Sequence, residues 1–113
     1  MFISHTDVGD NLRKIVILGR LDIMGTESIA RELENLAAAP KKGVVVDLSR
    51  LKFLASLGIR ALLKSAKVVE ERGGKMVLLN PDANATKTLQ TARIDDLIPI
   101  YRSLDEAVRA VST

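Results

Sequence analysis

The residue best placed to do chemistry is Ser56, which directly precedes a stretch of helical periodicity. A serine at a helix start can accept a hydrogen bond from a free backbone N–H, which stabilises the helix by about 1 kcal/mol. We therefore expect Ser56 to be the N-cap. A phosphate on its hydroxyl would add roughly −1.5 to −2 charges at a helix N-terminus, where the dipole and free N–H groups favour anions. The position would tolerate phosphorylation.

The neighbours of Ser56 indicate a docking surface. Leu57 falls opposite the apolar face of the predicted helix, so we expect its side chain to be exposed beside the hydroxyl. Gly58 costs about 1 kcal/mol of helix propensity relative to alanine, and it would let another backbone come close. Met24, in an earlier turn, would extend the apolar surface. A phosphate on Ser56 would place charge in any apolar interface made there.

The sequence offers little for catalysis or metal binding. A Ser-His-Asp site needs a histidine, and the single one, His5, is expected on an edge strand far in sequence from Ser56. Asp22 and Asp47 could share a cation, but two carboxylates make a poor metal site, and Asp47 is simply the first polar residue after a buried strand. The chain contains no cysteine for thiolate ligands. We expect no enzymatic activity, cofactor or metal.

Charge and aromatic content argue against direct binding of nucleic acid. The net charge of +3 is spread along the chain, and aromatic residues make up only 3% of it. Arg60, Lys64 and Lys67 recur at helical spacing and form a basic stripe. A solvated helix face explains this stripe, although an acidic protein partner could also use it.

Short apolar runs, separated by glycine and proline residues, have the composition of buried β-strands. They are Ile15–Leu18, which Gly19 is expected to end, Val44–Val46, Met76–Leu79 and Ile98–Tyr101. Pro99 places the last run at a sheet edge, because proline cannot donate to a strand ladder. Residues 2–5 would add another edge strand.

Helical periodicity fills the intervals between these runs. Thr26 is the expected N-cap of the first helix, Gly73 the stop of the second, and Ser103 with Glu106 a capping box for the last. The predicted helices centre on Ile29–Ala37, Ile59–Val69, Thr86–Ala92 and Leu104–Val111.

Strands that alternate with helices predict an α/β fold with a mostly parallel sheet. In such sheets the functional turns follow the carboxyl ends of the strands, where Asp22 and Ser56 are expected. A chain of 113 residues, 47% hydrophobic and 27% charged, fits one domain spanning residues 1–113. It shows no signal peptide and no apolar run of membrane-spanning length, so we expect a cytoplasmic protein without membrane insertion.

Several turns resemble those of the STAS domain family, named for sulfate transporters and anti-sigma factor antagonists. Gly19–Asp22 resembles the family's Gly-x-Leu-Asp turn, and Asp47–Ser49, followed by Phe53–Leu54, resembles the segment leading to its Asp-Ser-x-Gly site. Ser56–Gly58 occupies that site. Further matching features are Gly74-Lys75, Asn80-Pro81, Ile100-Tyr101 and Ser103–Ala107. The resemblance implies a STAS-like sheet with about four helices packed largely on one side.

The resemblance also implies a function. In free-standing bacterial members, the serine of this site is phosphorylated by a partner that is both a serine kinase with a histidine-kinase-like ATPase fold and an anti-sigma factor. Ser56 would take that role. The unphosphorylated form binds the anti-sigma factor and frees the sigma factor, and a serine phosphatase restores it. The implied partner-binding residues are Asp22, Met24, Ala55, Ser56, Leu57, Gly58 and Arg60.

One residue departs from the family pattern. The family often has aspartate directly before the serine, where this chain has Ala55. That carboxylate could orient the hydroxyl or engage the kinase. STAS domains also act in lipid-transport complexes, stressosome-like assemblies, and secretion or biofilm regulation. A role of that kind, by protein binding without phosphorylation, stays open.

Overall fold

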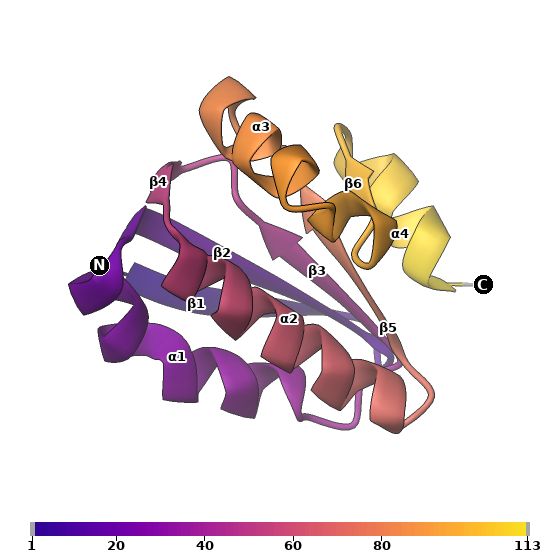
Figure 1. Cartoon of the computed structure of the whole chain (residues 1–113). Coiled ribbons are helices and arrows are strands. Elements are labelled where there is room, and N and C mark those ends of the chain that lie inside the picture. Colours follow the sequence, from indigo (N-terminus) through magenta and orange to yellow (C-terminus); the bar gives the residue numbers. More distant parts are fainter. Residues whose placement is uncertain (1, 113) are drawn as a thin grey trace.

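The computed structural model describes residues 2–112, and its architecture is a twisted sheet flanked by helices (Figure 1). The strands lie in the order β1-β2-β3-β5-β6, with β4 paired to the far end of β2. They span β1 Phe2–Val8, β2 Leu12–Leu21, β3 Gly43–Asp47, β4 Leu51–Leu54, β5 Lys75–Leu79 and β6 Ile100–Tyr101. β1 runs antiparallel to β2 and the other pairs are parallel. The predicted α/β class and mostly parallel sheet are confirmed.

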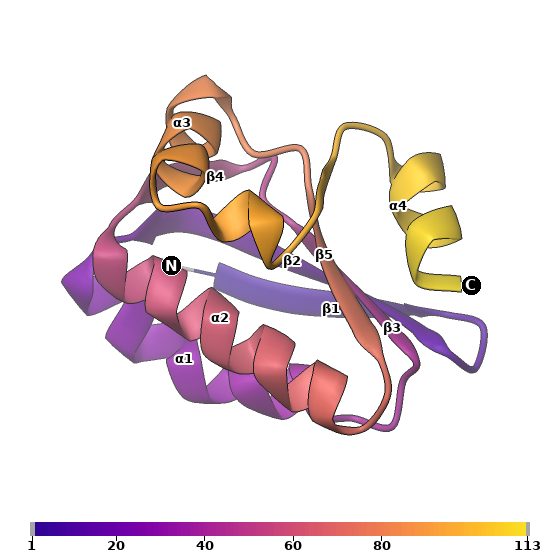
Figure 2. The same ribbon diagram turned by 45° about the vertical axis from the view of Figure 1, so that its right-hand side comes forward.

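Helices cover the two faces of the sheet unequally. They are α1 Ile23–Ala37, α2 Ser56–Glu71, α3 Ala83–Thr91 and α4 Leu104–Ser112, with a 3₁₀ turn, η1, at Ile94–Asp96. α1 and α2 lie side by side under the sheet, and α4 lies on the opposite face (Figure 2). Side-chain alternation in β3 produces this division. Val44 and Val46 join the main core with α1, α2 and α3, whereas Val45 packs with Ala107 and Val111 of α4.

β2 extends beyond the apolar run that predicted it, because Gly19 does not end the strand. Gly19 has φ of +110°, in the region that favours glycine, and the register shifts between Gly19 and Arg20. β2 therefore pairs with β3 as far as Val16 and with β4 from Gly19 onward. β4 lies in a segment expected to be a turn. This change of partner brings the end of β4 beside the end of β2.

Two of the predicted helix ends are confirmed. The Ser103 hydroxyl accepts the Glu106 N–H at 3.2 Å and donates to the Glu106 carboxylate at 3.2 Å. Gly73, just after the end of α2 in the sequence, has φ of +83°. The Gly74 N–H donates to the Val69 carbonyl at 3.0 Å. These contacts fix the last turn of α2 and the start of α4.

Candidate functional site

The candidate site lies where β2 and β4 end and lead into α1 and α2 (Figure 1). Parallel pairing sets Arg20 opposite Phe53 and Leu21 opposite Leu54. The Ala55 N–H then donates to the Leu21 carbonyl at 3.0 Å. The turn that carries Asp22 and the turn that carries Ser56 are thus joined by the backbone, as expected for the carboxyl ends of neighbouring parallel strands.

Ser56 is the first residue of α2 and not its N-cap. The N-cap is Ala55, whose backbone is extended and whose methyl group cannot accept a hydrogen bond. The prediction that Ser56 caps the helix is therefore wrong. In the described part of the chain no side chain caps α2, whereas Asp22 caps α1 and Asp82 caps α3. Ser56 is exposed, and its hydroxyl has no hydrogen-bond partner in residues 2–112, so it is available to another molecule.

Gly58 serves the interior of the domain. It is buried in the first turn of α2, and a Cβ added there would lie 2.8 Å from the Leu21 Cβ and 3.0 Å from the Leu54 Cδ1. Only glycine therefore lets α2 approach the end of β2 this closely. Another backbone does come close here, as expected, and it is that of β2 at the Leu21 carbonyl oxygen.

Leu57 is half-buried and not fully exposed as predicted. Its side chain lines a groove of about 170 Å³ between α1 and α2. The groove is lined by Thr26, Glu27, Ala30, Leu57, Arg60, Ala61 and Lys64. α1 packs against α2 beside Leu57, which explains the partial burial. A partner that reaches Ser56 would also meet an apolar hollow one residue away.

Asp22 lies in the candidate site and also has a structural role at the start of α1. Its Oδ1 accepts the Gly25 N–H at 2.8 Å, and its Oδ2 lies 3.5 Å from the Arg20 Nε. The hydrogen bond from the Gly25 N–H holds the pKa of the Asp22 carboxyl below its usual range, and the nearby Arg20 guanidinium lowers this pKa further. Asp22 is the N-cap of α1, so the expectation that Thr26 caps it is wrong. Thr26 is buried, and its hydroxyl has no partner among the described residues.

Arg20 and Phe53 form an exposed pair that the sequence reasoning did not single out. The Arg20 guanidinium lies 4.5 Å from the centre of the Phe53 ring, within the range of a cation–π contact. Their pairing across β2 and β4 produces this contact. Arg20 and Phe53 are the penultimate residues of β2 and β4, the two strands that lead into the turns carrying Asp22 and Ser56. The sequence does not predict β4, and without this strand no sequence pattern places Arg20 and Phe53 side by side.

Apolar side chains stand in solvent around these turns. Met24 is 81% exposed, as expected, and its neighbour Ile23 is 65% exposed. Phe53 adds an aromatic side chain that is 43% exposed. The fold gains little from large apolar groups left in water, and a cluster of them beside a free hydroxyl is typical of a protein-binding surface. We call Ile23, Met24, Phe53, Ser56 and Leu57 the Ser56 surface.

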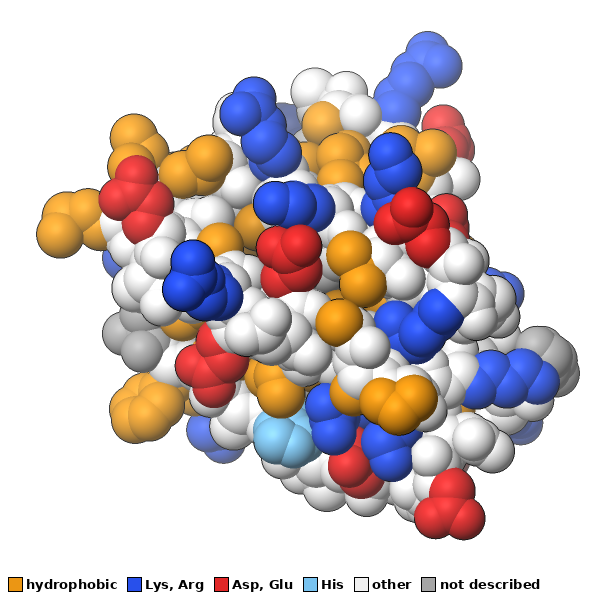
Figure 3. Space-filling view, turned by 90° about the horizontal axis from the view of Figure 1, so that it is seen from below, with side chains coloured by type: hydrophobic (Ala, Val, Ile, Leu, Met, Phe, Trp, Pro, Cys, Tyr) orange, Lys and Arg blue, Asp and Glu red, His pale blue; other side chains and the backbone are white. Residues whose placement is uncertain are grey.

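Arg60 and the rest of the basic stripe lie exposed along α2. The Lys64 Nζ lies 3.5 Å from the Glu34 Oε2 of α1, so part of the positive charge is paired. On the face formed by α1 and α2, Lys and Arg side chains are interspersed with Asp and Glu (Figure 3). This mixed pattern is that of a solvated helix face and differs from the continuous basic surface of a nucleic-acid binder.

Asp47 and His5 are the other two residues whose side chains could take part in chemistry, and neither belongs to the Ser56 surface. Asp47 accepts the Ser49 N–H at 2.9 Å and lies 3.6 Å from the Lys14 Nζ, so it completes a turn after β3. His5 pairs with Ile15 in mid-β2, away from the strand end that carries the site. Within residues 2–112, no three Asp, Glu, His or Cys side chains converge in a way that suits a metal ion. In the same range, no helix has the length and apolarity to cross a membrane.

Comparisons with known proteins agree with this geometry. The family model for the STAS domain matches residues 6–107. BtrV of Bordetella bronchiseptica, which is named as an anti-sigma factor antagonist, is 32% identical over 88 residues, covering 74% of this chain and 76% of BtrV.

Two solved structures have a similar fold. An anti-sigma factor antagonist from Mycobacterium paratuberculosis matches with a TM-score of 0.88 and 20% identity over 99% of this chain and 94% of that one. Phosphorylated SpoIIAA, a Bacillus cell fate determinant, matches with a TM-score of 0.71 and 22% identity over 97% of this chain and 99% of that one. The family model, which spans most of the chain, and the 32% identity to BtrV show that the protein belongs to the STAS domain family.

Proposed function

We propose that the protein is an anti-sigma factor antagonist whose binding is switched by phosphorylation of Ser56. In this proposal the unphosphorylated form binds an anti-sigma factor that is also a serine kinase, and the sigma factor is released. Phosphorylation of Ser56 ends the binding, and a serine phosphatase restores it. The similarity to BtrV supports the general role, and the similarity in fold to phosphorylated SpoIIAA supports the mode of control.

The observation that carries the proposal is the state of the Ser56 hydroxyl. It is exposed and unused by the fold, and it lies among apolar side chains that the core does not need. A structural cap would have left the hydroxyl engaged with the helix. A general base would have marked a catalytic serine, and the single histidine lies elsewhere. A free hydroxyl within a docking surface is suited to modification.

The fold could accept a phosphate at Ser56 without rearrangement. The uncapped first turn of α2 provides the positive end of a helix dipole and free N–H groups, which favour anions. Arg60 follows Ser56 by four residues and so lies on the same side of α2. The same phosphate would place roughly −1.5 to −2 charges among Met24, Phe53 and Leu57. Burying that charge in an apolar interface is strongly unfavourable, so the partner would be released.

Phosphorylation with the serine kinase encoded in the same genome tests the switch directly. The protein is incubated with that kinase and ATP, and the modified residue is located by mass spectrometry. We expect one phosphate, on Ser56, and none on the Ser56→Ala variant. Ser49 and Ser103 are exposed internal controls. Phosphate at either of them, or none with any kinase of this type, would contradict the proposal.

Ala55 favours a second candidate function. The residue before the serine carries no carboxylate to orient the hydroxyl, so the Ser56 surface could bind a partner that never phosphorylates it. The protein would then be a binding subunit of another assembly, such as a lipid-transport complex. Ala55→Asp distinguishes the two functions. A faster phosphorylation of this variant by the same kinase would show that the kinase uses the site, and an absence of phosphate on both forms would favour the second function.

A further inference from the structure

Among the described residues, 2–112, nothing pairs with the backbone groups along the outer edge of β1. β1 is the end strand of the sheet and pairs with β2 without interruption from Phe2 to Val8. The carbonyl of Asn11, the residue just before β2, accepts a hydrogen bond from the Gly43 N–H of β3. Backbone groups alternate in direction along a strand, so every second residue counted from Asn11 directs its N–H and C=O groups to β3. The intervening residues of β2 then bond to β1.

This alternation decides which groups of β1 point outward. The β2 residues that bond to β1 are opposite Phe2, Ser4, Thr6 and Val8. The N–H and C=O groups of Ile3, His5 and Asp7 therefore face away from the sheet. An edge strand of this kind is a template for another strand. Because Ile3 packs against the main core, the side chains of these three residues lie on the α1 face.

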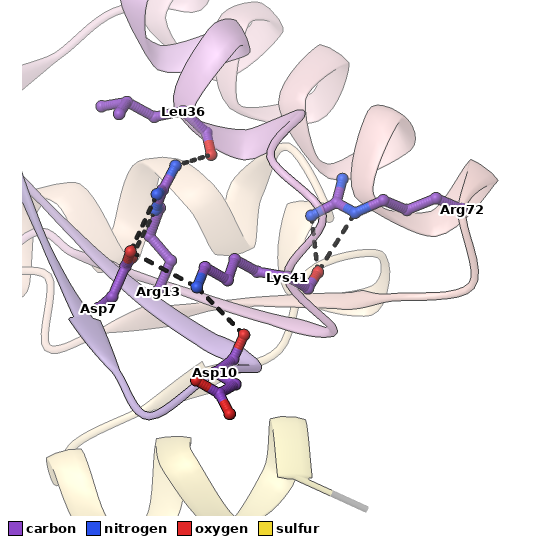
Figure 4. A network of polar contacts seen from close by, with 6 residues as sticks. All are labelled: Asp7, Asp10, Arg13, Leu36, Lys41 and Arg72. Atoms are coloured by element: carbon purple, nitrogen blue, oxygen red, sulfur yellow. Dashed lines mark hydrogen bonds and ion pairs between the residues drawn. The ribbon is translucent and has the colours of Figure 1, made fainter.

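β1 lacks the usual features that prevent edge-to-edge pairing. Its sequence, Phe2–Val8, contains no proline or lysine, and its register shows no bulge. Its one carboxylate, Asp7, is engaged within the domain. The Arg13 Nε lies 2.7 Å from the Asp7 Oδ1, and the Lys41 Nζ lies 3.5 Å from its Oδ2 (Figure 4). These ion pairs fix the end of the strand, so a second strand would find an ordered edge.

We propose that two copies of this chain pair through β1 in an antiparallel arrangement centred on His5. In this register His5 lies opposite His5 of the second copy, and Ile3 lies opposite Asp7. These are the residues whose backbone groups point outward, so each pair exchanges N–H···O=C bonds. No carboxylate faces a carboxylate.

The side chains of the remaining residues also match in this register. Phe2 lies opposite Val8, and Ser4 lies opposite Thr6, all on the sheet face remote from α1. Phe2 is 71% exposed and Val8 is 45% exposed, so each copy supplies an unburied apolar group for the other. An aromatic residue opposite a β-branched one is a stabilising cross-strand pair. This self-complementarity favours a second copy over an unrelated strand.

The dimer would leave the Ser56 surface free. Phe2 pairs with Leu18 near the end of β2 that carries the site, and Val8 pairs with Leu12 at the other end. Since the second β1 runs in the opposite direction, its site lies at the opposite end of the joined sheet. The dimer therefore presents two separate binding surfaces, and the pairing does not depend on the proposed function of Ser56.

Cysteine substitution tests the register, because the chain contains no cysteine of its own. Hydrogen-bonded antiparallel pairs have Cα atoms about 5.5 Å apart, within the reach of a disulfide. We expect His5→Cys to form a disulfide-linked dimer on mild oxidation. Ser4→Cys and Thr6→Cys should each do so at least tenfold more slowly alone, and rapidly when the two are mixed. Ser112→Cys, exposed on α4, is the control for collisional oxidation.

Analytical ultracentrifugation of the unmodified chain tests whether the pairing occurs without a covalent bond. We expect a concentration-dependent dimer, and we expect His5→Pro to weaken it at least tenfold, since this proline removes an outward N–H and no β1–β2 bond. His5→Ala keeps the N–H and should dimerise like the wild type. If His5→Pro unfolds, hydrogen exchange of the wild type decides, because the His5 and Asp7 amides should become protected only at high protein concentration.

Any of the following results would overturn the proposal. One is a wild-type chain that stays monomeric at millimolar concentration. Another is a dimer in which these amides exchange as fast as in the monomer, because the contact would then lie elsewhere. The third is oxidation of His5→Cys no faster than that of Ser112→Cys. A dimer that cross-links through Thr6→Cys alone would show a different register and would equally contradict the pairing centred on His5.

Discussion

Replacing Gly58 with alanine should destabilise the domain, although alanine is the better helix former. At an unobstructed helical position the change would stabilise by about 1 kcal/mol. Here the new Cβ would lie 2.8 Å from the Leu21 Cβ, 3.0 Å from the Leu21 carbonyl oxygen and 3.0 Å from the Leu54 Cδ1. Leu21 is fully buried and its Cβ is attached to the strand backbone, so it cannot move aside without disturbing β2.

Overpacking of this kind costs roughly 1–3 kcal/mol, which outweighs the gain in helix propensity. We therefore expect Gly58→Ala to lower the free energy of unfolding by about 1 kcal/mol, with an upper value of about 2 kcal/mol. Urea unfolding followed by circular dichroism gives the midpoint and the slope, and an unchanged slope would show that the two states stay comparable.

The sign of the effect decides whether the reasoning holds. A more stable Gly58→Ala variant would show that α2 does not pack on β2 as described. Ala61→Gly, in the same helix, is a control in which helix propensity should destabilise by about 1 kcal/mol, and loss of the Ala61 methyl, which packs against the core, adds to this cost. Partner binding measured at a temperature where Gly58→Ala is folded should be close to that of the wild type, because Gly58 itself is buried.

Three further predictions concern the site and the polar network. Leu57→Lys should weaken partner binding, measured by titration calorimetry, at least tenfold. It should cost less stability in thermal unfolding than the core change Leu62→Ala, and equal losses of stability would show that Leu57 belongs to the core. Phe53→Ala should weaken partner binding as well, with a similar unfolding midpoint, and unchanged affinity would exclude Phe53 from the interface. Arg13 and Lys41 lower the Asp7 pKa to about 2, so Asp7 stabilises the fold above its usual pKa, and this stabilisation is lost as pH falls from about 4 to 2. Asp7→Asn should flatten that part of the stability profile, and an unaltered acid transition would contradict the role of the ion pairs.

Much of the fold could be predicted because its signals are local. The run Val44–Val46 is apolar at every position and forms the central strand β3, and the spacing of Ile59, Leu62 and Val69 identifies the buried side of α2. Both are readable because burial imposes a period on the sequence. Ser103 and Glu106 likewise form a cap from residues three apart.

What could not be predicted depends on contacts between distant segments. β4 has only four residues, with Leu51 and Leu54 buried and two exposed residues between them, so it shows no strand period of its own. It becomes a strand because β2 changes partner at Gly19. The Arg20–Phe53 contact follows from that change, so no local sequence pattern predicts it.

The errors at the candidate site have one physical origin. The sequence predicts Thr26 and Ser56 as caps because hydroxyl side chains favour helix starts, yet α1 begins at Ile23 and α2 begins at Ser56 itself. Helix starts in this fold are set by where β2 and β4 end. The site residues could be located along the sequence, but the one-residue shift that frees the Ser56 hydroxyl could not.

Partner affinity before and after phosphorylation is the most direct measure of the central claim. The anti-sigma kinase from the same genome is titrated with the unmodified protein, with the protein phosphorylated at Ser56 alone, and with Ser56→Ala. We predict tight binding of the unmodified protein and of Ser56→Ala, and binding at least tenfold weaker for the phosphorylated form. Equal affinity of the kinase for the unmodified and phosphorylated proteins would contradict the account.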